Sequence, residues 1–376
     1  MDIYLDNAAT TRVCPAAAEA AMRAMTEVYG NPSSTHRVGR EARRLLEDSR
    51  KQIAAALGCA SGEVFFTSGG TEADNWALLS GSELARRTGR HIISSQTEHD
   101  AVRRSLDVLE RRGFTVTRLA PDETGAIPID AVAAALRPDT ALVSLMLVNN
   151  ETGAINDIAA VSRLLRRQKS AALLHTDAVQ GFLKTPFSPK RLGADLVSIS
   201  GHKIHAPKGV GALYIRQGLR LPPLLSGGSQ ENGLRPGTEP LPAIAAFGAA
   251  AAEASAQMAE YLPRMQQLRQ YCADTLRAHL PGVVLIPGGA GHILSFSLPG
   301  YRSEVLMNFL EARGISVSKS SACKKGGRSH VLEAMGLPAA VIDGALRVGL
   351  SRFTTQKELD TLCLALSEAA ASLAHR

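Results

Sequence analysis

Four polar residues whose side chains could do chemistry together each follow a short apolar run of the sequence. They are His99 after HIISS (91–95), Asn150 after ALVSLMLV (141–148), Asp177 after AALLH (171–175) and Lys203 after DLVSIS (195–200). Each one alone has an ordinary explanation as a helix cap or a solvated loop residue. Together they offer an imidazole, an amide, a carboxylate and an amine, which can move protons and bond to an aldehyde.

A fifth run, VFFT (64–67), is followed by the glycine-rich segment SGGTEADN (68–75). Gly69 and Gly70 permit a tight turn, and Thr71 with Asp74 resembles a capping box that begins a helix. The free N–H groups of such a helix start suit a phosphate, although an ordinary glycine turn explains the segment equally well. A dinucleotide-binding loop would need G-x-G-x-x-G, which this segment lacks. A phosphate site beside an amine and a carboxylate is what pyridoxal phosphate requires.

Cys323 lies in the polar, glycine-rich segment SVSKSSACKKGGRSH (316–330), which is typical of an exposed loop. A lone cysteine is usually a buried small hydrophobe, and this neighbourhood favours a functional thiol instead. Lys324, Lys325 and Arg328 should favour the thiolate. A thiol of pKa 8.5 is ~3% ionised at pH 7, and lowering the pKa by one unit gives roughly a quarter, so these charges tune the nucleophile without supplying the catalysis. The other four cysteines have helical or apolar surroundings that predict burial: Cys14, Cys59, Cys272 and Cys363.

The elements that must position these residues alternate between strand-like and helix-like patterns. Strands are predicted at 64–67, 91–95, 114–120, 141–148, 171–175, 195–200, 211–216, 292–299 and 346–352, and helices at 72–87, 100–112, 130–137, 157–169 and 243–279. The alternation predicts an α/β fold with a mainly parallel sheet covered by helices on both faces. In such sheets ligands bind beyond the carboxyl ends of the strands, where the polar residues above are found.

The chain is expected to form two domains. A glycine- and proline-rich stretch at 225–242 ends the first alternating region, a long helix follows, and the last hundred residues mix strands and helices. We predict a large cofactor-binding α/β domain over 13–258. A smaller α+β domain, built from 1–12 and 259–376, would carry the Cys323 loop.

Composition excludes several classes of protein. The formal net charge is +7, yet basic residues alternate with acids and aromatics make up only 4%, which indicates a solvated surface rather than direct nucleic-acid binding. Five cysteines without a CxxC pair argue against a disulfide framework or a structural metal site. The segment MDIYLDNAATT lacks the features of a signal peptide, and no apolar stretch has the length of a membrane span. A cytoplasmic location away from membranes is expected.

The motifs in this order resemble the cysteine desulfurases of the class V aminotransferase family, the group that includes bacterial IscS and NifS. The resemblance covers nearly the whole chain and rests on YLDNAATT (4–11), GNPSSTH (30–36), FTSGGTEADN (66–75), TEHDAV (97–102), VNNETG (148–153), HTDAVQ (175–180), SISGHKIHAPKGVGALY (198–214), LRPGTE (234–239), SSAC (320–323) and LRVGLSRFT (346–354). It implies the type I fold of pyridoxal phosphate-dependent transferases and active sites at a homodimer interface.

The resemblance also implies a role for each residue that would hold the cofactor. Lys203 would bind it covalently, Asp177 would pair with the pyridine nitrogen, and His99 would stack over the ring and move protons. Gln180 and Asn150 would lie near the ring oxygen. The remaining cofactor-binding residues would lie at the phosphate end, the last of them reaching it from a second subunit: Gly70, Thr71, Ser200, His202 and Thr238.

For the substrate, the resemblance implies that Arg347 and Asn150 bind the carboxylate of L-cysteine. Cys323 would take the sulfur as a persulfide, leave L-alanine, and pass the sulfur to an iron–sulfur scaffold or a tRNA-thiolation enzyme. The segment after Cys323 is about two residues shorter than in housekeeping members, Ala206 stands where a glycine is common, and Lys319-Ser320-Ser321 stands where a glycine often precedes the SAC motif.

Rival interpretations share the fold. A selenocysteine lyase, a cystine lyase or an aminotransferase is the first, although an aminotransferase needs no protein thiol. A catalytically idle sulfur-relay protein is the second, and the joint presence of Lys203, Asp177, His99, Arg347 and Cys323 argues against it.

Overall fold

The computed structural model describes residues 2–319 and 327–373. Its largest element is a seven-stranded sheet in the order β2-β8-β7-β6-β5-β3-β4. Strand β8 is antiparallel to both of its neighbours, and the other pairs are parallel, so the predicted mainly parallel sheet is confirmed. The strands are β2 (Val64–Thr67), β3 (His91–Ser95), β4 (Thr115–Leu119), β5 (Thr140–Ser144), β6 (Leu173–Asp177), β7 (Leu196–Ser200) and β8 (Gly211–Ile215).

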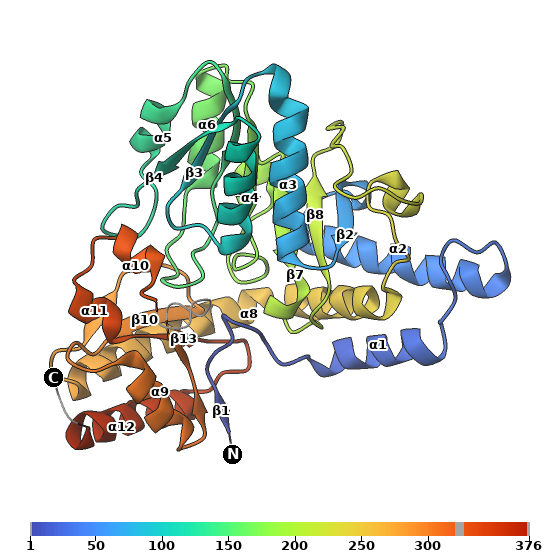
Figure 1. Ribbon diagram of the computed structural model, residues 1–376. Helices are drawn as coiled ribbons and strands as arrows, with labels where there is room; N and C mark the ends of the chain where they lie inside the picture. Colours follow the sequence, from blue (N-terminus) through green and yellow to red (C-terminus); the bar gives the residue numbers. More distant parts are fainter. Residues whose placement is uncertain (1, 320–326, 374–376) are drawn as a thin grey trace.

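Helices cover both faces of this sheet (Figure 1). Helices α3 (Gly70–Leu84) and α4 (Asp100–Arg111) lie on one face. Successive strand residues point to opposite faces, so Ile92 packs in the core under α3 and α4 while Ile93 packs in the core on the other face. The second core includes residues of α1 (Pro15–Thr26), α2 (Arg37–Leu57), α5 (Ile129–Ala135), α6 (Ile158–Arg167), α7 (Pro189–Leu192) and the first part of α8 (Leu241–His279).

A second, smaller sheet lies beyond the carboxyl ends of the large one, in the order β12-β13-β10-β9 with every pair antiparallel. Its strands are β9 (Val284–Ile286), β10 (Ile293–Ser297), β12 (Ser318–Lys319) and β13 (Ala345–Gly349), and β1 (Ile3–Tyr4) pairs with β11 (Ile315–Ser316) beside it. This part is completed by helices α9 (Ser303–Glu311), α10 (His330–Ala334), α11 (Ala339–Asp343) and α12 (Gln356–Ser372). The large part also contains four short 3₁₀ turns, η1 (Ser61–Glu63), η2 (Ala85–Arg87), η3 (Gly201–Lys203) and η4 (Gln230–Gly233).

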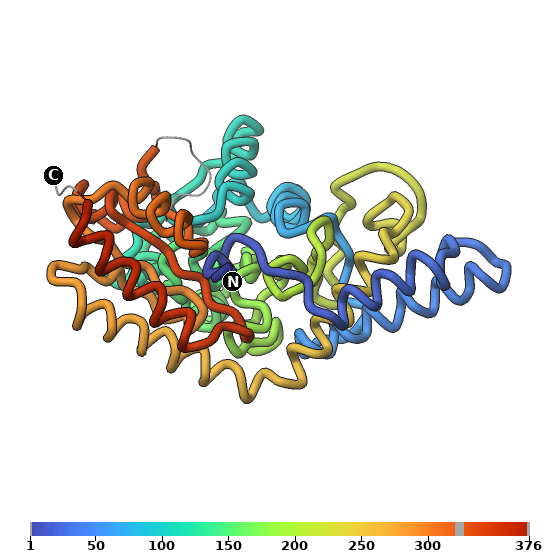
Figure 2. The backbone as a smooth tube through the Cα atoms, turned by 90° about the horizontal axis from the view of Figure 1, so that it is seen from below, coloured from blue at the N-terminus to red at the C-terminus, as the bar shows by residue number. Residues whose placement is uncertain are grey.

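Helix α8 joins the two parts. Its first residues pack in the large core, and Cys272, Ala273 and Leu276 near its end pack in the small one together with Leu5 from the start of the chain. Figure 2 shows α8 running along the lower edge of the view, with α1 and α2 projecting away from the small sheet. The division into 13–258 and 1–12 with 259–376 stays a prediction, and the large core extends along α8 as far as Met265.

Several strand boundaries differ from the sequence predictions, among them the ends of β5 and β6. Strand β5 ends at Ser144 rather than at residue 148, because the chain then leaves the ladder and Val148 forms a separate bridge with Ile155. Strand β6 runs through Asp177 rather than ending at 175, because the buried ring of His175 bonds to hydroxyls on both neighbouring strands. Within the described residues, every helix is too short or too polar to cross a lipid bilayer.

Candidate active site

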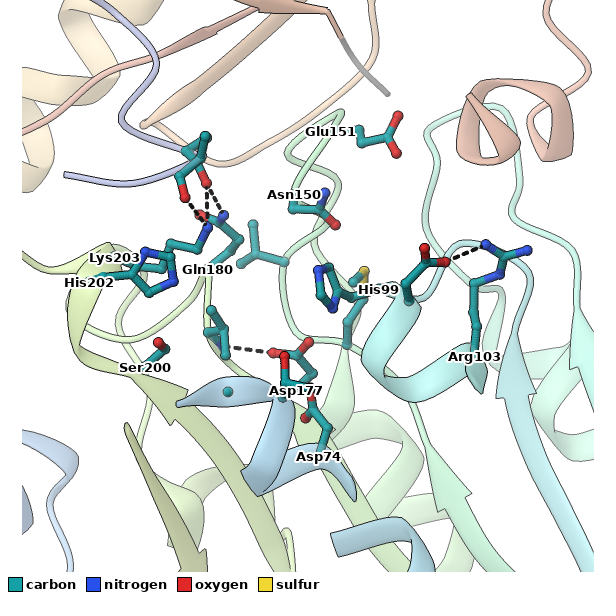
Figure 3. Close-up of a pocket in the computed structure, with 18 of the residues that line it drawn as sticks. Asp74, His99, Arg103, Asn150, Glu151, Asp177, Gln180, Ser200, His202 and Lys203 are labelled. Atoms are coloured by element: carbon teal, nitrogen blue, oxygen red, sulfur yellow. Dashed lines mark hydrogen bonds and ion pairs between the residues drawn. The ribbon is translucent and has the colours of Figure 1, made fainter. Parts of the chain in front are cut away.

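One cavity of about 370 Å³ lies at the carboxyl ends of β6 and β7 and gathers nearly all of the predicted site residues (Figure 3). Its lining includes Gly70, Thr71, His99, Asn150, Asp177, Gln180, Ser200, His202, Lys203 and Arg347. Thr238 is exposed and stands apart from this lining. Cys323 lies outside the described residues, although Arg328 and His330, which follow it in the chain, line the cavity.

Lys203 is the last residue of η3, the turn that follows β7. Its Nζ donates to the carbonyl oxygens of Ala8 and Ala9 at 2.9 and 2.5 Å. These alanines belong to the N-terminal DNAATT segment, which Thr11 fastens to η3 by donating to the carbonyl of His202 at 2.9 Å. Sequence reasoning missed this role of Ala8 and Ala9, because they contribute backbone atoms.

Asp177 ends β6 at the base of the cavity. It is buried, and its Oδ1 accepts the N–H of Val179 at 2.9 Å. Burial raises the pKa of Asp177, while the neighbouring His99 and Lys203 act in the opposite direction. A protonated ring nitrogen beside the Asp177 carboxylate would offset the cost of burying its charge. Pyridoxal phosphate needs this pairing between a carboxylate and its ring nitrogen.

His99 faces the cavity above Asp177 (Figure 3) and is the N-cap of α4. Its Nδ1 accepts the backbone N–H of Ala101 at 3.1 Å. The proton of the neutral ring therefore sits on Nε2. This cap fixes the ring plane, so the imidazole can stack on a ligand and exchange a proton with it.

A layer of buried ionisable groups lies beneath the cavity. Asp74 is fully buried 3.6 Å from Nε2 of His175, and burial, followed by the charge of Asp177, raises the pKa of Asp74 well above its usual range. Burial lowers the pKa of His175 to about 3. The surroundings therefore disfavour a charge on Asp74 and on His175, whereas His99 and Lys203 favour a charge on Asp177. The predicted capping box is wrong, because Gly69 is the N-cap of α3 and Asp74 points into the core.

The phosphate-like end of the site is the start of α3. Gly69 has φ 151° and ψ −177°, a conformation that only glycine adopts readily, and it turns the first N–H groups of α3 outward. An adjoining cavity of about 440 Å³ is lined by Gly70, Thr71, Ser200, His202 and Lys208. Burial, followed by the charge of Lys203, lowers the pKa of His202 to about 4, so it is a neutral ligand here.

Arg347 on β13 joins the small sheet to the cavity. Its guanidinium donates from Nη1 to the carbonyl of Asn150 at 2.7 Å and from Nη2 to Asp6 and Ser318 at 3.0 and 2.7 Å. The side chain is buried, and among the described residues its Nε has no partner. A buried guanidinium in such a fork suits a carboxylate ligand.

One lining residue, Glu151, carried no clear signal in the sequence. Glu151 is buried and accepts a hydrogen bond from Ser329, and burial raises the pKa of Glu151 to about 7. Arg328, which we expected to favour the Cys323 thiolate, forms a fork with Asp343 at 2.7 and 2.8 Å. Its charge is therefore already compensated.

The residues present fit pyridoxal phosphate. Lys203 offers the amine, Asp177 the buried carboxylate, His99 the stacking ring and the start of α3 the phosphate seat. Each comes from a different segment, and all face one cavity.

This fold and site define a class, and the chain belongs to it: the class V aminotransferase family model matches residues 3–362. Its relatives narrow the assignment to the cysteine desulfurases of that family. The chain is 40% identical to the cysteine desulfurase of a Nostoc strain over 97% of this chain and 92% of that protein. It is 39% identical to cysteine desulfurase IscS of Methanosarcina thermophila over 95% of this chain and 89% of that protein.

Solved structures agree with this assignment. A NifS-like protein, 36% identical, superposes with a TM-score of 0.94 over 99% of this chain and 100% of that one. SspA in complex with cysteine, 30% identical, superposes with a TM-score of 0.81 over 94% of this chain and 100% of that one. The predicted family and type I fold are confirmed.

Proposed function

We propose that this protein is a cytoplasmic cysteine desulfurase that binds pyridoxal phosphate on Lys203, converts L-cysteine to L-alanine, and takes the sulfur on Cys323. The observation that carries the proposal is the meeting of an amine, a buried carboxylate and a buried guanidinium in one cavity, from Lys203, Asp177 and Arg347. A homodimer is part of the proposal, with Thr238 reaching the phosphate of the neighbouring subunit.

Each side chain then has a defined task. Pyridoxal phosphate, when bound, supplies the electron sink for chemistry at the α-carbon of the substrate. Asp177 would keep the ring nitrogen protonated, and Arg347 with Asn150 would hold the substrate carboxylate. Lys203 would take the α-proton of the substrate, and His99 would exchange protons through Nε2.

The sulfur step belongs to Cys323. Its thiolate attacks the sulfur of the substrate, an S–S bond forms, and the Cβ–S bond breaks with its electron pair left on the carbon side. The products are a persulfide on Cys323 and, after protonation at carbon, alanine. An acceptor protein, either an iron–sulfur scaffold or a tRNA-thiolation enzyme, then removes the terminal sulfur.

Replacing Cys323 with Ser tests this assignment. The variant should keep the yellow colour and still bind cysteine, because the cofactor and carboxylate sites are untouched. Alanine production should collapse, because a hydroxyl is too weakly acidic to attack sulfur at neutral pH. Alanine and sulfide are measured together, with mass spectrometry of the peptide that contains Cys323.

The same substitution at Cys59, which is partly buried, is the matched control and should leave turnover unchanged. Wild-type alanine production by Cys323→Ser in the presence of a reductant, with persulfide on another cysteine, would overturn the role of Cys323. It would leave the cofactor chemistry intact.

A further inference from the structure

A second lysine, Lys184, is partly buried and lies close to Lys203. Both residues line a small internal cavity of about 20 Å³ behind the active site, together with Leu183 and Tyr261. Leu183 has φ 55°, a left-handed conformation that a bulky side chain rarely adopts. The hydroxyl of Tyr261 donates to the carbonyl of Leu183 at 2.6 Å and holds this turn. The backbone is thus bent immediately before Lys184.

The amine of Lys184 makes a hydrogen bond that leads back to the active site. Its Nζ donates to Oε1 of Gln180 at 2.8 Å, and Nε2 of His292 lies 3.3 Å from the same oxygen. The other end of the amide, Nε2 of Gln180, donates to the carbonyl of Ala8 at 2.7 Å. That carbonyl also accepts the amine of Lys203 at 2.9 Å. A chain of hydrogen bonds therefore links Lys184 to Lys203 through Gln180 and Ala8.

The hydrogen bonds of this network fix the orientation of the Gln180 amide, because one end of an amide accepts hydrogen bonds and the other end donates them. A donor at Lys184 holds the Gln180 oxygen away from Ala8 and turns its NH₂ group toward the Ala8 carbonyl. Without that donor, only the longer contact with His292 holds the Gln180 oxygen, so the amide is held less firmly against the Ala8 carbonyl. The Ala8 carbonyl would then be a less well-placed acceptor for Lys203.

The charges around Lys184 are consistent with such a role. Burial, followed by the charges of Lys203 and Arg347, lowers the pKa of Lys184 well below its usual range. Burial, followed by the charge of Lys184, lowers the pKa of His292 well below its usual range as well. These shifts disfavour a second charge behind Lys203, and amines and imidazoles donate hydrogen bonds whether or not they are charged.

We propose that Lys184 is a positioning residue for Lys203: it orients the Gln180 amide, which keeps the Ala8 carbonyl where it seats the reactive amine. The inference rests on the proposed function, because it assumes that Lys203 captures pyridoxal phosphate. It assigns a task to a lysine that lies outside the lining of the main cavity.

The test measures how fast cofactor-free protein gains the absorbance of lysine-bound pyridoxal phosphate, across a range of pH. We expect Lys184→Met to slow this capture about tenfold and Lys184→Gln, which keeps a donor, to slow it less. Lys190→Met, the same change at an exposed lysine, should have no effect. Melting temperatures and circular dichroism report whether each variant is folded.

A double variant identifies the route. If Lys184 acts through Gln180, then the double variant Lys184→Gln/Gln180→Ala captures the cofactor no more slowly than the single variant Gln180→Ala. The double variant Lys184→Met/Gln180→Ala should give the same result if it folds. Additive losses would overturn the inference, as would equal rates in the Lys184 and Lys190 variants. A wild-type protein that captures no cofactor on Lys203 would instead overturn the proposed function.

Discussion

Two buried carboxyl groups near the cavity, those of Asp177 and Glu98, have different surroundings. Asp177 faces the cavity, whereas Glu98 is fully buried under it. Oε1 of Glu98 accepts from Oγ of Ser95 at 2.6 Å and from the N–H of Met146 at 3.1 Å, and Oε2 has no partner among the described residues. Burial raises the pKa of Glu98 to about 8. The protein therefore keeps Glu98 protonated at neutral pH.

Glu98→Gln should change how stability depends on pH. Between the usual pKa of about 4.5 and the folded pKa of about 8, the folded protein retains a proton that the unfolded chain releases, so stability falls as pH rises through this window. The loss approaches 1.4 kcal/mol per pH unit. We expect similar melting temperatures for wild type and Glu98→Gln at pH 5, and a variant that melts several degrees higher at pH 8.5.

The control for this series is Glu123→Gln, which changes an exposed glutamate. A difference between wild type and Glu98→Gln that stays constant from pH 5 to 8.5 would contradict a raised pKa at Glu98.

Asp177→Asn should retain the cofactor and lose most of its turnover. An amide cannot keep the ring nitrogen protonated, while Lys203 and the start of α3 remain in place. We expect at least a hundredfold loss in kcat, about 2.7 kcal/mol, with normal absorbance of lysine-bound pyridoxal phosphate. Near-normal turnover in a fully loaded variant would remove Asp177 from this role.

At the residue scale, sequence patterns could predict the charged and polar groups that end strands, such as Lys203 and Asp177. They could not find Ala8, whose contribution is a carbonyl oxygen. They also could not find Lys184, because its inward direction depends on the left-handed turn at Leu183. The resemblance to a family supplied Gln180 and Arg347, whose roles no spacing indicated.

Among the elements, the start of α3 has the sharpest geometric requirement. Gly69 lies in a region of φ and ψ that costs other residues about 1–3 kcal/mol. Gly69→Ala should therefore shift the first turn of α3 and weaken cofactor binding about tenfold, measured as the dissociation constant during reconstitution.

Gly62→Ala is its matched control, because a Cβ at Gly62 meets nothing within 4 Å and its φ is not positive. Equal cofactor affinity in the two variants would show that the start of α3 does not hold the phosphate.

Strand predictions succeeded where apolar runs coincided with burial, as in β2 and β3, whose bounds match the sequence analysis. They failed at the end of β6, where His175, Thr176 and Asp177 are polar and yet buried. Hydrophobic periodicity cannot reveal a buried polar residue whose partners, Ser144 and Ser198, lie on other strands.

For the whole molecule, we predict that subunits complete each other's sites. Lys203→Ala and Thr238→Glu should each be inactive as homodimers, the second because an added carboxylate repels the phosphate. A mixed dimer of the two has one site with both native residues, so co-expressed and doubly tagged dimers should recover about half of wild-type turnover. Recovery in the mixed dimer, measured as alanine formed, supports a shared site.

Full activity of Thr238→Glu alone would contradict this arrangement, as would sedimentation of a fully active monomer at assay concentration. Wild-type protein carrying the same two tags is the control for the effect of tagging.

The N-terminal segment makes a contact that can form only late in the synthesis of the chain. Asn7 donates to the carbonyl of Gly349 at 2.9 Å, a contact that spans 342 residues of chain. At ribosomal rates of about 5–20 residues per second, those first residues wait roughly 17 to 70 seconds for their partners. The core of the large domain can form during that interval, and Thr11 can already bond to His202. The contact of Asn7 with Gly349 forms only after β13 has been made, so a newly made chain should gain its large core early and this last anchor of the N-terminal segment late.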